Sequence, residues 1–98
     1  MRSIKHKMIW LILIIFVITG CASIEKAESL HRQGEKEAAL EMAISLLEDD
    51  SSKVRLRAVK LIGKIGGPEA GSALHQRLGE QDDRVRRAVV RNLGILQY

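Results

Sequence analysis

The sequence is poor in cysteine, proline and aromatic residues, and each shortage excludes a class of protein. Its 98 residues include one cysteine, so no disulfide can form within the chain. The aromatic residues are Trp10, Phe16 and Tyr98. Only Tyr98 follows position 20, so residues 21–98 have no set of aromatic rings on which nucleic-acid bases could stack. The single proline leaves room for long uninterrupted helices.

Residues 21–98, the part of the chain that we expect to fold, have almost no excess of positive charge. The formal net charge of the whole sequence is +4. Three of the 16 Lys and Arg residues lie within residues 1–20, which leaves 13 basic against 12 acidic residues in residues 21–98. A nearly neutral domain attracts nucleic acid weakly, so we expect no nucleic-acid binding.

The first 21 residues combine a short basic segment, an apolar run and the cysteine. The apolar run covers the 11 residues 8–18, which is short for a membrane span of about 20 residues. The run is followed by small residues and Cys21. The stretch Ile18, Thr19, Gly20 and Cys21 resembles the lipobox of a bacterial lipoprotein signal peptide. The resemblance implies cleavage after residue 20 and a diacylglyceryl group on the thiol of Cys21.

A lipid on Cys21 would anchor residues 21–98 in a membrane, outside the cytoplasm. Stable anchoring needs two or more acyl chains, which bacterial lipoproteins carry. Ala22 follows the cysteine, where an aspartate usually implies retention in the inner membrane. The resemblance therefore favours the periplasmic face of the outer membrane or the cell surface. An uncleaved anchor over residues 8–24 is the alternative, and it would also hold the rest of the chain outside the cytoplasm.

From residue 24 onward the apolar residues recur with helical spacing, and no stretch alternates cleanly with period two. We expect a lead-in helix over residues 24–32 that ends near Gly34. Four further helices are expected over residues 35–47, 53–65, 68–78 and 84–97. Acidic turns at residues 49–52 and 80–83 precede the second and fourth of these helices. The pattern predicts an all-α fold.

Two of these helices share a pattern with a period of 31 residues. Val54-Arg55 aligns with Val85-Arg86, and Gly63 aligns with Gly94. An acidic turn, Val-Arg and an apolar stripe that ends in glycine resemble short HEAT-like repeats of the phycobilisome-lyase type. The resemblance implies a short α-solenoid fragment of about two helical pairs in residues 35–98, after a lead-in segment at 21–34. Residues 27–47 also resemble a tetratricopeptide helix pair, which is the alternative for the first pair.

The reactive side chains form no catalytic or metal-binding pattern. His31 and His75 are 44 residues apart and are expected on different helices, and neither has a second histidine at metal-ligand spacing. Ser72 lies one turn from His75, but no acid is placed to orient the histidine. We therefore expect no enzymatic activity, no cofactor and no metal site.

The arginines and lysines after residue 50 fall into two groups. Arg55 and Arg86 each follow a core-facing valine, and the HEAT-like resemblance implies pairs with turn aspartates, for which Asp50 and Asp83 are the candidates. Other basic residues form what we call the basic stripe: Lys53, Arg57, Lys60, Lys64, Arg84, Arg87 and Arg91. We consider two interpretations of the stripe, a solvated face and a docking groove for an acidic partner segment or anionic head groups.

The last expected helix carries apolar residues that its own pair does not use. Val59 and Val90 occupy the same repeat position, about 140° from the core-facing valine of each helix. We expect the following pair to cover Val59, whereas Val90 would have no following pair. Ile95 and Tyr98 also differ from the polar cap that terminal repeats carry. We therefore expect a contact surface at this end, for a second copy in a homo-oligomer or for the main partner.

Together these features predict a lipid-anchored, non-enzymatic helical-repeat protein. Its expected role is that of an adaptor or scaffold that binds another protein in the cell envelope. Two alternatives are an accessory subunit of an envelope enzyme or lyase, and a residual fragment of a longer repeat protein.

Overall fold

The structure is a computed structural model that describes residues 23–97 of the chain. Within these residues the chain forms five α-helices and one short 3-10 helix, with no strand. The predicted all-α class is therefore confirmed. The elements are α2 (Ile24–Arg32), α3 (Lys36–Ser45), η1 (Leu46–Glu48), α4 (Ser52–Ile65), α5 (Pro68–His75) and α6 (Asp83–Leu96).

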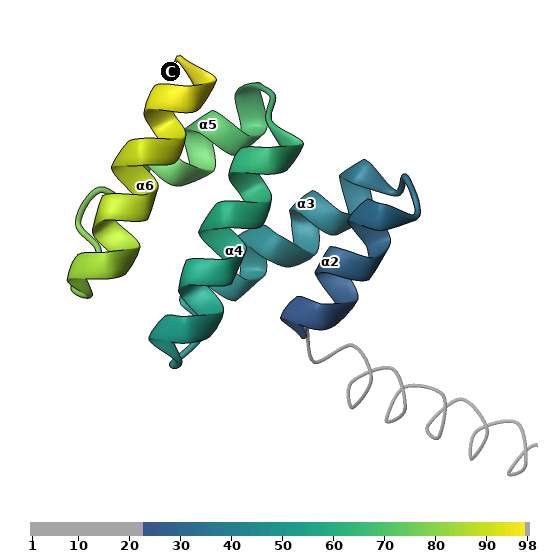
Figure 1. Cartoon of the computed structure of the whole chain (residues 1–98), viewed down its shortest axis with the longest axis horizontal. Coiled ribbons are helices and arrows are strands. Elements are labelled where there is room, and N and C mark those ends of the chain that lie inside the picture. Colours follow the sequence, from purple (N-terminus) through teal and green to yellow (C-terminus); the bar gives the residue numbers. More distant parts are fainter. Residues whose placement is uncertain (1–22, 98) are drawn as a thin grey trace, which may run out of the picture.

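The helices form two layers. In Figure 1, α2, α4 and α6 lie side by side and run in nearly the same direction, while α3 and α5 lie behind them. The central helix α4 contacts each of the other four α-helices. The helical pair α3–α4 packs against the helical pair α5–α6, which is the arrangement of a short α-solenoid.

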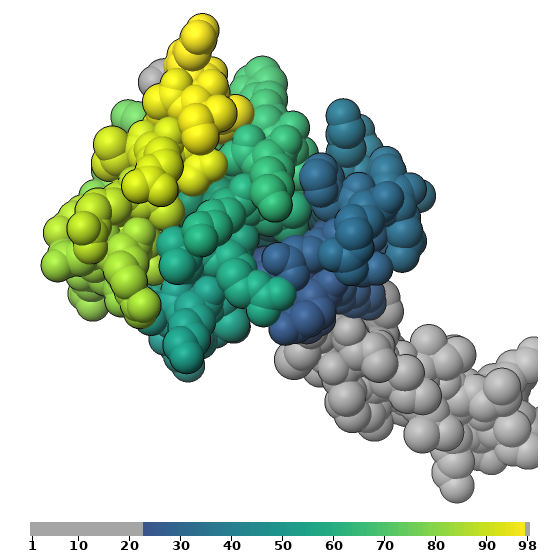
Figure 2. Space-filling model, viewed as in Figure 1, coloured from purple at the N-terminus to yellow at the C-terminus, as the bar shows by residue number. Residues whose placement is uncertain are grey.

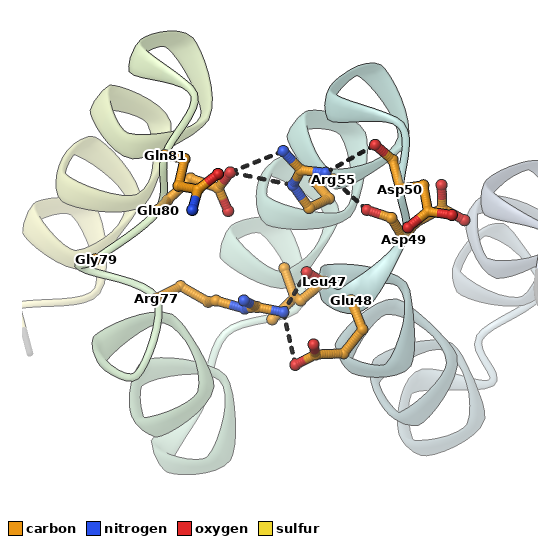
Figure 3. Close-up of a pocket in the computed structure, with 9 residues that line it drawn as sticks. All are labelled: Leu47, Glu48, Asp49, Asp50, Arg55, Arg77, Gly79, Glu80 and Gln81. Carbon is orange, nitrogen blue, oxygen red and sulfur yellow. Dashed lines mark hydrogen bonds and ion pairs between the residues drawn. The ribbon is translucent and has the colours of Figure 1, made fainter.

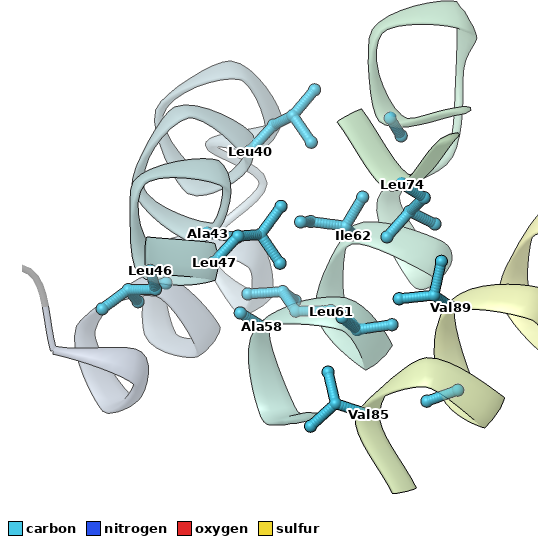
Figure 4. Packing of buried hydrophobic residues seen from close by; sticks show 14 of the residues in the cluster. Leu40, Ala43, Leu46, Leu47, Ala58, Leu61, Ile62, Leu74, Val85 and Val89 are labelled. Atoms are coloured by element: carbon cyan, nitrogen blue, oxygen red, sulfur yellow. The ribbon is translucent and has the colours of Figure 1, made fainter. Parts of the chain in front are cut away.

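The core fills the space between the two layers. Ile62 of α4, Leu74 of α5 and Val89 of α6 are fully buried. Figure 4 shows Ile62 between Leu47 of η1 and Leu74 of α5. Full burial of each such side chain contributes about 1.5–3 kcal/mol. Because residues from both helical pairs enter one cluster, the pairs share a single continuous core.

Polar side chains and glycines define the ends of the helices. The side chains of Ser23, Ser51 and Asp82 accept hydrogen bonds from backbone N–H groups in the first turns of α2, α4 and α6. Between α4 and α5, Gly66 and Gly67 have φ values of 74° and 95°, which residues with a Cβ rarely adopt. The sharp turn that they form reverses the chain at the end of the first helical pair.

Two helices are shorter than the sequence predicts. The helix expected over residues 35–47 is α-helical only to Ser45 and continues as η1. The helix expected over residues 68–78 ends at His75. In both places the N–H groups bond to carbonyls three residues earlier, as from Arg77 to Leu74. These tighter turns end the α-helix although the apolar pattern continues through them.

Candidate partner-binding face

The basic stripe lies along the outer sides of α4 and α6. All seven of its side chains belong to exposed residues. Residues three or four apart share one side of a helix, so the cations form one row along α4 and another along α6. The two helices pack side by side, as Figure 2 shows, and the rows are therefore neighbours.

A groove of about 240 Å³ lies between α4 and α6, and we call it the α4–α6 groove. Its floor is apolar, with half-buried Leu56 and buried Ala88. Four cations of the stripe complete its lining, namely Lys60, Arg84, Arg87 and Arg91. A groove with cations around an apolar floor is complementary to a segment in which acidic side chains flank an apolar side chain.

Arg57 differs from the rest of the stripe because it already has partners. Its guanidinium lies 3.2 Å from the carboxylate of Glu25 and 2.5 Å from that of Glu28, both on α2. The hydrogen bond to Glu28 is the main cause that raises the pKa of Arg57. The pKa of Glu25 is lowered, first by a bond from its own backbone N–H and then by Arg57. Arg57 thus links α2 to α4.

A second groove, of about 290 Å³, lies between α2 and α4. Arg57, Lys60 and Lys64 line it from α4, and His31 and Arg32 line it from α2. His31 and Arg32 were not predicted as groove residues, because the sequence pattern of the repeats begins after the lead-in helix. Their place in the last turn of a helix before the first expected pair was the only available signal. Lys60 borders both grooves, so the basic stripe and Arg32 of α2 form what we call the basic face, which Glu28 interrupts where it pairs with Arg57.

The turn arginines have structural roles. Arg55 donates hydrogen bonds to the backbone oxygens of Asp49 and Asp50, at 2.7 and 3.1 Å. Its carboxylate partner is Glu80 at 2.9 Å, as Figure 3 shows. The expected pair with the Asp50 carboxylate is therefore wrong, because the guanidinium points across to the next turn. Arg86 lies 2.5 Å from Asp83, its expected partner.

The cavity beside Arg55 is a junction between turns. It measures about 330 Å³, and Figure 3 shows the residues that line it. Arg77 reaches across to the backbone oxygen of Leu47 and to the carboxylate of Glu48. Within residues 23–97, every buried side-chain nitrogen and oxygen has a hydrogen-bond partner. The polar groups of this cavity therefore bind one another and join the two pairs.

The apolar residues expected at the C-terminal end do not lie together. Val59 is fully buried, whereas Val90 is 57% exposed and Ile95 is 66% exposed. Five residues at 100° each set Val90 and Ile95 about 140° apart on α6. Ile95 instead lies one turn beyond Arg91, on the side of the basic face. Tyr98 lies outside the described residues, and contact through this end stays a prediction.

The sequence also led to predictions about metal binding, membrane spans and the lipid anchor. No group of three or more His, Cys, Asp or Glu side chains in the described part of the chain could hold a metal ion. No helix within residues 23–97 is both long and apolar enough to cross a membrane. Cys21 and the lipobox residues Ile18, Thr19 and Gly20 lie outside the described residues.

Layered helices, a 31-residue period and arginines that bind the interhelix turns all point to one class of repeat. A family model described as HEAT repeats matches residues 23–96. The chain belongs to the HEAT-repeat family. The match includes α2, and it also covers residues 27–47, where a tetratricopeptide pair was the alternative. No curated protein and no solved structure matches the chain. HEAT repeats are typically non-enzymatic and commonly serve as scaffolds for protein interactions.

Proposed function

We propose that this HEAT-repeat protein is a lipid-anchored, non-enzymatic adaptor of the cell envelope that binds an acidic segment of another protein. The observation that carries the proposal is the α4–α6 groove, with four cations around an apolar floor. Within the described part of the chain, the side chains of Lys60 and Arg91 make no ion pair or hydrogen bond. They are therefore available to carboxylates of a partner.

The remaining cations of the groove have weak local contacts. Arg84 lies 3.8 Å from the carboxylate of Asp82, and Arg87 donates to the backbone oxygen of Asp83 at 3.3 Å. Both side chains are exposed, so a partner could replace these contacts at low cost. Residues 21–98 are almost neutral overall, yet the cations gather on one face. Such a separation of charge steers an acidic partner toward that face.

The sequence motif at Cys21 supports the membrane-anchored part of the proposal. Because α2 begins at Ile24, only Ala22 and Ser23 would separate a lipidated Cys21 from the helical domain. Such a short connection would keep the basic face close to the membrane, where it could bind envelope proteins. We accordingly propose a location at the periplasmic face of the outer membrane or at the cell surface.

The test is capture of cross-linked partners by the full chain, solubilised in a non-ionic detergent. Lys60→Glu combined with Arg91→Glu should abolish capture at unchanged helicity. Lys36→Glu is the control, because Lys36 is an exposed cation on α3, which lines neither groove. Capture by the wild type should also weaken as salt rises, since exposed charges are screened over about 8 Å at physiological ionic strength.

Two results would overturn the proposal. The first is capture that is insensitive to salt and survives both charge reversals. The second is binding of the pure protein to vesicles with anionic lipid that both reversals abolish, while capture of proteins continues unchanged. The basic face would then bind lipid head groups instead of a protein segment.

A further inference from the structure

We infer that the α4–α6 groove accepts an acidic amphipathic helix that lies along the axes of α4 and α6. The inference rests on the proposed function and specifies the form of the acidic segment. The ligand would carry carboxylates on two flanks and a stripe of apolar residues between them. Helices of this kind commonly bind in grooves through residues at i, i+3, i+4 and i+7.

The protein already contains one example of this contact. Glu25 and Glu28 are three residues apart on α2, so they lie on the same side of that helix. Both carboxylates bind Arg57 of the basic stripe. A helix with carboxylates one turn apart is therefore a ligand for cations on the outer side of α4.

The spacing of the cations fits a second such helix. Arg84, Arg87 and Arg91 are at i, i+3 and i+7 on α6, and they span about 10.5 Å at 1.5 Å per residue. On α4, Lys60 lines the groove, and Lys53 lies seven residues before it, beyond the groove lining. A ligand helix has the same rise per residue, so its carboxylates at i, i+3 or i+4, and i+7 would meet these cations in register.

The apolar residues of the face lie between and beyond the cation rows. Leu56 and Ala88 form the floor of the groove. Ile95 is 66% exposed and continues the row of Arg91 by one turn. A ligand with an apolar stripe between its acidic flanks would cover these surfaces, whereas a uniformly acidic segment would leave them in contact with water.

A second copy of the chain offers a poorer ligand. Its α3 exposes Glu37 and Glu41, which are four residues apart on one side of the helix. The exposed residues near them on that side are the small residues Ala38 and Ser45. They cannot fill the groove above Leu56. The chemistry of the groove therefore favours a different chain with larger apolar residues.

The probe is a peptide of about 18 residues with leucines between two glutamate flanks, fixed as a helix by a side-chain staple. A control peptide of identical charge carries two central prolines, which prevent helix formation. Binding to the full chain in non-ionic detergent is followed by fluorescence anisotropy. The stapled peptide should bind about tenfold more tightly than the proline peptide, because it is already helical and loses little conformational entropy on binding.

Variants of the protein locate the binding site. Arg91→Glu should abolish binding of the stapled peptide, and a peptide with lysine in place of the facing glutamate should restore it. Lys36→Glu should bind the original peptide as the wild type does. Restoration by the exchanged charge would support the register, since a merely misfolded variant could not recover in this way.

The outcomes separate the inference from the proposed function. Equal binding of the stapled and proline peptides would overturn the helical form and leave an acidic partner segment in place. Failure of both peptides to bind would also overturn the helical form, provided that Lys60→Glu combined with Arg91→Glu still weakens capture of the native partner. Self-association lost in Glu37→Lys with Glu41→Lys would assign the groove to a second copy. Capture insensitive to the charge reversals would overturn both proposals.

Discussion

Asp82 sets the start of α6 through its carboxylate. This group accepts hydrogen bonds from the backbone N–H groups of Arg84 at 2.9 Å and Val85 at 3.2 Å. The bond from Val85 is the main cause that lowers the pKa of Asp82. We expect Asp82→Ala to reduce the free energy of unfolding, and Asp82→Asn to retain most of it, because asparagine also caps helices well. Urea denaturation at neutral pH measures both.

The same residue predicts how stability depends on pH. The pKa of Asp82 is lower in the folded than in the unfolded chain, where it is about 4. Its contribution is therefore complete above pH 4 and is lost as the pH falls through the folded value. Asp82→Asn has no charge to lose at this position. The wild type should lose stability relative to this variant only in acid, and a constant difference across the range would contradict the assignment.

Gly63 and Gly94 occupy one repeat position in two different environments. A Cβ on Gly63 would lie 1.9 Å from Oδ1 of Asn92, whereas nothing lies within 4 Å of a Cβ on Gly94. The Asn92 side chain is held in place by its bond to the backbone oxygen of Ala88. We expect Gly63→Ala to destabilise by about 1–3 kcal/mol. Gly94→Ala should instead stabilise by about 0.5–1 kcal/mol, because it strengthens an exposed helix.

A double variant checks the cause of the Gly63 effect. Asn92→Ala removes Oδ1 and Cγ, the two atoms that lie closest to the new Cβ, and keeps the Cβ of residue 92 at 3.0 Å. Adding Gly63→Ala to that variant should therefore cost much less than adding it to the wild type. Thermal unfolding of the four proteins provides the comparison. Equal costs in both backgrounds would show that Asn92 is not the obstacle.

The sequence could predict which residues occupy equivalent positions in the two repeats, but not which side chains of other helices contact them. The period of 31 residues identified Gly63 with Gly94 and Arg55 with Arg86. It did not identify Asn92 or Glu80 as their neighbours, because periodicity defines faces along one helix and says little about contacts between helices. The contact between Arg55 and Glu80 joins residues 25 positions apart. Its geometry depends on how two turns approach each other.

At the scale of elements, the two turn arginines join the helical pairs to different degrees. The side chains of Arg55 and Glu80 are 17% and 5% exposed, whereas those of Arg86 and Asp83 are 46% and 73% exposed. We expect Arg55→Ala to destabilise by about 3 kcal/mol, because it leaves a buried carboxylate without its cation. Arg86→Ala should cost about 1 kcal/mol or less. Equal losses in guanidinium denaturation would contradict a special role for Arg55.

The number and order of helices were predictable, but the role of α2 was not. Apolar spacing, glycines and acidic turns identified every α-helix from residue 24 onward, but not the 3-10 helix η1. No copy of the Val-Arg pattern occurs in α2, so the 31-residue period could not connect it to the repeats. Its packing against α3 and α4 and its carboxylate contacts with Arg57 make it part of the same array. These interactions depend on tertiary structure.

At the scale of the whole molecule, the proposed anchor depends on one atom, the sulfur of Cys21. This residue lies outside the described residues, so the prediction derives from the sequence motif. Cys21→Ser should remove all labelling by a palmitate analogue and leave the leader uncleaved, because serine offers no thiol for the diacylglyceryl group. Immunoprecipitation after metabolic labelling measures the first effect and mass spectrometry the second. Equal labelling of wild type and variant would refute the anchor.

The central place of α4 has a consequence for motion. This helix contacts all four other α-helices, whereas α6 contacts only α4 and α5 extensively. Local unfolding can therefore begin at α2 or α6 while α4 and its contacts with the remaining helices stay folded. Amide protons of α4 should exchange with deuterium most slowly, and those of α2 and α6 earlier. The α4 side of the proposed groove would then stay folded while the α6 side opens locally. Release of a bound helix would therefore begin on the α6 side.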